Sequence, residues 1–147
     1  MYDEILVPTD GSAAAERAID HAVDLAARYD ARIHAFYVVD TSAYAALEGA
    51  GTTVVDVLEE QGEEAVDEIV AAAEAAGVEV ERVVRHGSPH RNILDYIDEA
   101  NVDLVVMGTH GRQGLDRYLL GSVTERVVRS SPVPVLTVRK DEDEEEV

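Results

Sequence analysis

The chain has 147 residues, of which 46% are hydrophobic, and this is enough for the core of one domain. It has no cysteine, which excludes disulfides, cysteine-ligated metals and thiol nucleophiles. Its 31 acidic residues against 12 Lys and Arg give a formal net charge of -19, which disfavours binding to nucleic acid or to an anionic membrane surface. No apolar run approaches membrane-spanning length and the first residues are acidic, so we expect a cytoplasmic globular protein.

The charges are unevenly distributed by type and by position. Lys140 is the only lysine, and six acidic residues occupy positions 141–146. Because a net charge beyond about eight is already high for a small domain, this composition favours a halophilic protein that works in molar salt, where screening removes self-repulsion. An acidic protein of ordinary cytoplasm is the alternative. We expect residues 1–140 to form one domain and residues 141–147 to be a disordered acidic tail.

In the first half of the chain, apolar runs alternate with helical patterns, which predicts a parallel sheet built from crossover units. Strands are predicted at residues 4–8 and 32–39, and a helix opens after Ser12. The pattern is lost between residues 40 and 51. A long helix then runs over residues 53–76, and its predicted inward-facing residues are Val55, Leu58, Ala65, Ile69 and Ala72.

The second half continues the alternation. A strand at residues 79–85 is followed by Ser88 and Pro89, which are typical of the cap and first position of a helix. A buried strand, a short helix and a last strand are predicted at residues 104–107, 122–130 and 133–138. Pro132 and Pro134 lack the N–H that a central strand needs, so the last strand is expected at a sheet edge. Together the elements predict a three-layer α/β sandwich.

The segment between the buried strand and the short helix carries the most informative pattern. Gly108, Gly111 and Gly121 remove side chains where backbone amides could face an anion, and the helix that follows offers its own unpaired amides. Ser122 and Thr124 add hydroxyl groups. Ser122 and the glutamate three positions later also fit a capping box, so a purely structural role for this serine stays open.

Two familiar phosphate-binding motifs are absent from the sequence. A Walker A loop requires lysine after its last glycine, and Lys140 is too far along the chain to serve. The dinucleotide fingerprint requires three glycines after the first strand, whereas residues 8–12 read Pro-Thr-Asp-Gly-Ser. Any phosphate must therefore be met by backbone dipoles, hydroxyls, a metal ion or arginine.

The spacing Gly108-x2-Gly111-x9-Gly121-Ser122 resembles the signature of the ATP-binding branch of the universal stress protein family. Three further segments resemble the family in the same order, so that the resemblance extends over residues 3–139; they are residues 5–12, 37–40 and 87–89. It implies an adenine nucleotide alpha hydrolase-like fold, a five-stranded parallel sheet of order 3-2-1-4-5, and a homodimer joined along the last strand, Val133 to Val138. Tyr37 departs from the histidine that many members carry there.

The resemblance also implies roles for individual residues. Asp10 would contact the ribose and could help to hold Mg²⁺ or Mn²⁺ near the phosphates, while Val38 would hold adenine through its backbone. The part of the site that holds the base and sugar would be lined by Pro8, Thr9 and Met107. The phosphates would be held by Gly108, Gly111, Gly121, Ser122, Val123 and Thr124.

The function implied by the resemblance is an ATP-binding regulatory or sensor module of the stress response. We assign no catalytic residue and expect slow ATP hydrolysis at most, because no general base or lysine is placed for efficient catalysis. The alternative is a dimeric interaction protein of the same fold that binds no nucleotide. His86 and His90 straddle a strand end and a helix start, so a shared metal ion is not expected.

Overall fold

The computed structural model describes residues 1–41, 51–109 and 121–139, with the side chains of residues 51–54 left aside. Five strands form one parallel sheet in the order β3-β2-β1-β4-β5, which confirms the predicted order. The strands are β1 (Glu4–Pro8), β2 (Arg32–Val39), β3 (Val80–His86), β4 (Leu104–Gly108) and β5 (Val135–Val138). The helices are α1 (Ala13–Tyr29), α2 (Gly51–Ala75), α3 (Pro89–Glu99) and α4 (Ser122–Ser130).

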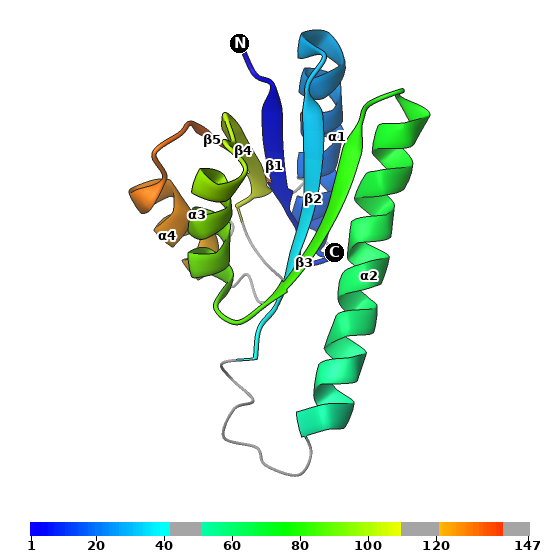
Figure 1. Ribbon diagram of the computed structural model, residues 1–147, viewed down its shortest axis with the longest axis vertical. Coiled ribbons are helices and arrows are strands. Elements are labelled where there is room, and N and C mark those ends of the chain that lie inside the picture. The colour runs from blue at the N-terminus through cyan, green and yellow to red at the C-terminus, as the bar shows by residue number, and fades with distance from the viewer. Residues whose placement is uncertain (42–50, 110–120, 140–147) are drawn as a thin grey trace.

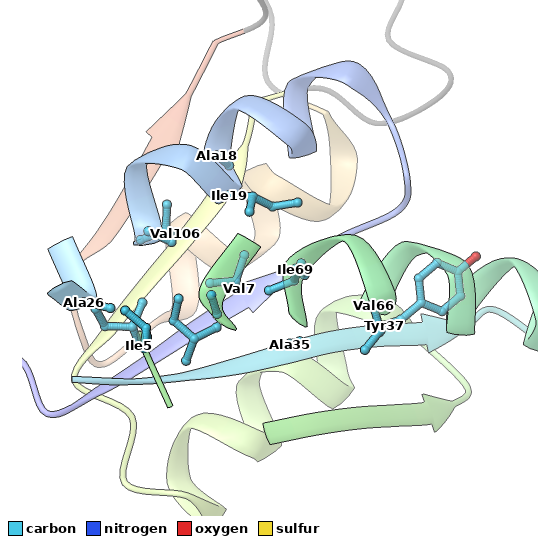
Figure 2. Close-up of a cluster of buried hydrophobic side chains, with 14 of the residues drawn as sticks. Ile5, Val7, Ala18, Ile19, Ala26, Ala35, Tyr37, Val66, Ile69 and Val106 are labelled. Carbon is cyan, nitrogen blue, oxygen red and sulfur yellow. The ribbon is translucent and has the colours of Figure 1, made fainter. Parts of the chain in front are cut away.

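The helices cover the sheet in two layers, with α1 and α2 on one face and α3 and α4 on the other (Figure 1). Each layer has its own apolar core. The core under α1 and α2 contains Ile5, Val7, Ile33 and Ile69, and part of it is drawn in Figure 2. The opposite core is smaller and centres on Phe36. The three-layer sandwich predicted from the alternating pattern is therefore the observed architecture.

Several predicted boundaries differ from the observed ones. The last strand begins at Val135 rather than Val133, although the Pro134 carbonyl already accepts a hydrogen bond from the Val105 amide (3.0 Å). Proline supplies the acceptor but not the donor, so regular pairing starts after it. On α2, Val66 and Ala73 are fully buried, whereas Ala72 of the predicted face is only partly buried.

A glycine in the middle of α2 accommodates an aromatic ring from β2. The Tyr37 side chain reaches from β2 towards α2 and is 7% exposed (Figure 2). A Cβ atom at Gly62 would lie 2.5 Å from Cδ1 and 2.8 Å from Cε1 of that ring. Glycine inside a helix costs about 1 kcal/mol relative to alanine, so the space it gives the ring explains its presence.

The two edge strands differ in character. On β3, Arg82 binds Glu63 (2.6 Å) and Asp67 (2.5 Å) of α2, while Arg85 binds Glu99 of α3 (2.8 Å). These exposed pairs contribute little stability each, but they place charge along that edge, which discourages strand addition. The residues of β5 carry no charge, and its Leu136 is 37% exposed.

No helix within the described ranges combines the length and the apolar character needed to cross a membrane.

Candidate functional site

The candidate site lies where the order of the strands reverses. β1 and β4 are neighbours in the sheet, but α1 follows β1 onto one face and α4 lies on the other (Figure 1). Open parallel sheets bind ligands in the crevice that such a reversal leaves at the carboxyl ends of the strands. β1 ends at Pro8 and β4 at Gly108, so the residues predicted from the sequence gather around this point.

The turn between β1 and α1 is held by short side chains. The Thr9 amide donates to the carbonyl of Phe36 (2.9 Å), and the Thr9 hydroxyl accepts from the Gly11 amide (3.1 Å). Oδ1 of Asp10 accepts from the Ser12 amide (2.9 Å), and Ser12 in turn caps α1. Gly11 has a φ of 80°, a conformation that favours glycine. The direction of the Asp10 carboxylate is thus set by the turn itself.

Val38 presents its backbone on the side of β2 that faces β1. The Phe36 carbonyl bonds to Thr9 on the β1 side of β2, and the Val39 carbonyl bonds to the Gly87 amide (2.9 Å) on the β3 side. Because backbone groups alternate sides along a strand, the N–H and C=O of Val38 face the β1 side, beyond the last residue of β1. This placement is compatible with the backbone contact to a base that the family resemblance implies.

Gly108 has a packing role that the sequence interpretation missed. A Cβ atom on this residue would lie 2.9 Å from the carbonyl carbon of Ala14 and 3.0 Å from the Ala15 nitrogen. Both atoms belong to the backbone of the first turn of α1 and have little freedom to move. Glycine at this position therefore lets α1 approach β4 closely, whether or not a phosphate also lies nearby.

The start of α4 corrects the capping interpretation of Ser122. The N-cap residue is Gly121, whose amide donates to the Thr109 carbonyl (2.6 Å), and Ser122 is the exposed first residue of the helix. A capping box on Ser122 is therefore wrong. The first hydrogen bond within the helix joins the Glu125 amide to the Gly121 carbonyl (2.9 Å). The amides of residues 122–124 therefore have no partner within the helix.

Thr124 ties the helix to the sheet. Its side chain is 4% exposed, and its hydroxyl donates to the carbonyl of Gly108 (2.8 Å). The hydroxyl proton is used in this bond, so the group that Thr124 offers to an anion is its backbone amide. Together, Gly121 and Thr124 fix the amino end of α4 against the end of β4.

The other predicted residues are placed as follows. Pro8 is buried, and Met107 is 5% exposed and packs in the core under α3 and α4. Val123 is partly buried against the same core. Gly111 lies outside the described residues, as do the tail from residue 140 and most of the glycine-containing segment.

A metal ion has few candidate ligands here. Across the three described ranges, no group of three or more His, Asp or Glu residues could hold one. His86 pairs with Glu59 (2.6 Å) and His90 contacts Ser88 (3.2 Å), so the two histidines have separate partners. A single carboxylate such as Asp10 suits Mg²⁺, which commonly binds one or two carboxylates together with phosphates.

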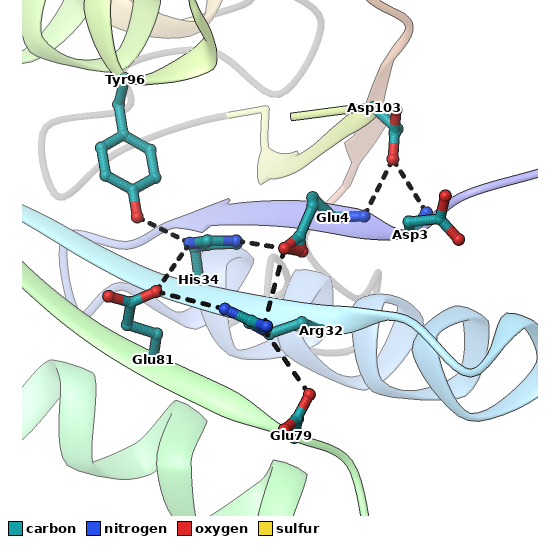
Figure 3. A network of polar contacts seen from close by, with 8 residues as sticks. All are labelled: Asp3, Glu4, Arg32, His34, Glu79, Glu81, Tyr96 and Asp103. Atoms are coloured by element: carbon teal, nitrogen blue, oxygen red, sulfur yellow. Dashed lines mark hydrogen bonds and ion pairs between the residues drawn. The ribbon is translucent and has the colours of Figure 1, made fainter. Parts of the chain in front are cut away.

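A second polar cluster, at the amino-terminal end of the sheet, was not predicted (Figure 3). His34 is 2% exposed; its Nδ1 lies 2.6 Å from the Tyr96 hydroxyl, and its Nε2 lies 3.5 Å from Glu4. Burial, and then the charge of Glu81, raise the pKa of Tyr96, so this hydroxyl stays protonated. The only hint of this cluster in the sequence was a lone histidine inside an apolar strand. The residues that contact it lie far from it along the chain, so the local pattern did not identify them.

The comparisons with known proteins agree with this geometry. The model of the universal stress protein family matches residues 1–139. The chain belongs to the universal stress protein family. A universal stress protein of Methanocaldococcus jannaschii is 40% identical over 146 residues, which are 98% of this chain and 86% of that protein.

Two solved structures of the same fold are informative. The hypothetical protein MJ0577 superposes with a TM-score of 0.86 at 32% identity, covering 97% of this chain and 99% of its own. A universal stress protein solved in complex with cAMP has a TM-score of 0.71 at 28% identity, covering 95% of this chain and 98% of its own. Both cover nearly the whole chain, so the shared fold includes the carboxyl ends of β1 and β4.

Proposed function

We propose that this universal stress protein binds an adenine nucleotide, ATP, in the crevice between β1 and β4, and works in the cytoplasm as a regulatory or sensor module of the stress response. The observation that carries the proposal is the start of α4. Gly121 occupies the cap position without a side chain, and the exposed Ser122 follows it without serving as a cap. Amides at such a helix start favour phosphate.

Two further observations support an adenine nucleotide as the ligand. The Val38 backbone faces the crevice, where it can hydrogen-bond to the edge of a base as backbone groups commonly do in nucleotide sites. A relative at 28% identity was solved with cAMP, which contains adenine. Asp10 and the phosphates would hold Mg²⁺ or Mn²⁺, which when bound neutralises phosphate charge. We assign no general base, so hydrolysis is slow at most.

Isothermal titration with ATP and Mg²⁺ in about 2 M KCl, where screening is nearly complete, tests the proposal. Gly121 has φ -63° and ψ 156°, which valine adopts readily, so Gly121→Val should fold and lose binding because the branched side chain blocks the phosphate. If the wild type binds no nucleotide, the dimeric interaction protein becomes the better assignment.

Ser122→Ala separates a ligand contact from a structural role. Because Ser122 does not cap α4, the alanine variant should keep the wild-type thermal midpoint and lose affinity for ATP by about fivefold, as expected for one hydrogen bond of about 1 kcal/mol. Ser130→Ala, at the other end of the same helix, is the matched control and should change neither quantity. A lower midpoint with unchanged affinity would contradict this role for Ser122.

We also propose a homodimer through β5. The uncharged β5 edge, with Leu136 partly exposed, is better suited to pairing than the charged β3 edge. Light scattering in about 2 M KCl should give a dimer for the wild type and a monomer for Leu136→Lys. Val57→Lys, at a residue of α2 that is 47% exposed, is the control and should remain dimeric. A monomeric wild type would rule the dimer out.

A further inference from the structure

His34 is a buried titratable side chain that the proposed function does not use. It lies near the start of β2, at the end of the sheet opposite to the candidate nucleotide site. The residue is 2% exposed, and its Nε2 atom has no hydrogen-bond partner among the described residues. A buried polar atom without a partner destabilises a fold, so its presence here needs a physical explanation.

The Tyr96 hydroxyl, 2.6 Å from Nδ1 of His34, indicates where the neutral ring carries its proton. Burial, and then the charge of Glu81, raise the pKa of Tyr96, so the hydroxyl keeps its proton and can donate it to Nδ1. The other face of the tyrosine is covered by the guanidinium of Arg85, 5.3 Å from the ring centroid, which pairs with Glu99. With Nδ1 as the acceptor, the proton of the neutral imidazole is on Nε2.

Carboxylates flank both nitrogens of the imidazole (Figure 3). Oε2 of Glu4, on β1, lies 3.5 Å from Nε2, and Oε2 of Glu81, on β3, lies 3.6 Å from Nδ1. Glu81 is also the residue paired with His34 in the register of β2 and β3. Charge-assisted hydrogen bonds are shorter, at about 2.7–2.9 Å, so the neutral ring lies between two negative charges without a hydrogen bond to either.

Arg32, two residues before His34 on β2, is the cation that partly balances these charges. Its Nε lies 3.7 Å from Glu4 and 3.6 Å from Glu79, and its Nη1 lies 3.9 Å from Glu81. The Asp103 carboxylate binds the amide of Glu4 (2.9 Å) instead of the ring. One arginine thus faces three glutamates in this part of the structure, which leaves a net negative charge beside His34.

We propose that His34 is a proton-binding site, through which mild acid ties together the amino-terminal ends of β1, β2 and β3. A proton taken from solvent at Nδ1 makes both ring nitrogens donors, and the imidazolium then binds Glu4 through Nε2–H. The Tyr96 hydroxyl becomes an acceptor for Nδ1–H, and its own proton turns towards Glu81. The proposal is independent of nucleotide binding.

The first test compares the pH dependence of stability in charge-matched variants. Urea unfolding of the wild type, of Glu4→Gln/Glu81→Gln and of the control Glu64→Gln/Glu74→Gln is measured at about pH 8 and about pH 5.5, on either side of the range in which histidine titrates. The control acids are exposed on α2, and about 2 M KCl screens the surface charges.

Acidification should increase the ratio of folded to unfolded protein about three- to tenfold more in the wild type and in the control than in Glu4→Gln/Glu81→Gln. An equal increase in all three proteins would overturn the proposal, because net charge alone would then account for it. A larger increase in the variant that lacks Glu4 and Glu81 would overturn it as well.

The second test observes the ring in the wild-type chain and needs no variant to fold. In nitrogen NMR spectra, Nδ1 of His34 should be unprotonated and Nε2 protonated at about pH 8, and both should be protonated at about pH 5.5. A ring that is still neutral at the lower pH would refute the proton site. A neutral ring with its proton on Nδ1 would refute the hydrogen-bond reversal at Tyr96.

Discussion

The contact between Gly62 and Tyr37 predicts a change of sign in a double-mutant cycle. Carbon atoms prefer to lie about 3.5–4.0 Å apart, so a Cβ atom 2.5 Å from the Tyr37 ring must displace it by about 1 Å. Overpacking of this kind costs about 1–3 kcal/mol, and alanine recovers about 1 kcal/mol of helix propensity. Gly62→Ala should therefore destabilise the wild type by up to about 2 kcal/mol.

The same substitution should have the opposite effect once the ring is removed. In a Tyr37→Val background, Gly62→Ala should stabilise the protein by about 1 kcal/mol, which gives a coupling energy of about 1–3 kcal/mol. Urea unfolding followed by circular dichroism measures all four proteins. Ala71→Gly, at an exposed position of α2, calibrates the propensity contribution alone. Equal effects of Gly62→Ala in both backgrounds would refute the packing argument.

Three further predictions concern packing, acidity and salt. Gly108→Ala should lower the free energy of unfolding by about 1–3 kcal/mol, because its Cβ would meet the backbone of α1; an unchanged value would refute the packing role. Burial, and then the charge of Glu16, raise the pKa of Glu68, so its contribution to stability is present below its unfolded pKa and is lost as pH rises through its folded pKa. Glu68→Gln should therefore raise the thermal midpoint at pH 7 but not at pH 3, whereas the control Glu64→Gln should change little. With a net charge of -19, the wild-type midpoint should rise between about 0.05 M and 2 M KCl, and equal midpoints would contradict the assignment to molar salt.

The sequence predicted the elements that depend on local pattern. The bounds of β1, β2 and α4 agree with the prediction, because each is a clear apolar run or amphipathic segment between strong breaks. The strand order came from the family resemblance, since periodicity alone does not say which parallel strands are neighbours. At the site, the strand order that the resemblance implies correctly places Asp10 and Gly108 near the ends of adjacent strands.

What the sequence could not supply depends on contacts between distant residues. Ser122 fits a capping box when the local sequence is considered alone. The cap of α4 is instead Gly121, which has extended backbone angles and whose amide bonds to the Thr109 carbonyl. The packing role of Gly108 requires knowing how closely α1 approaches. The partner of His34, Tyr96, lies 62 residues along the chain, so no local pattern could have revealed their hydrogen bond.

The unlike edges of the sheet limit how far copies of the chain can associate. Pairing through β5 would use up the uncharged edge of both partners and leave a continuous sheet bounded on each side by a β3 strand. Those outer strands carry Arg82 and Arg85 in ion pairs with neighbouring helices, so they offer a poor template for another strand. Assembly of this kind would stop at two copies, because the dimer would offer no unprotected edge strand to which a further copy could add as in a fibre.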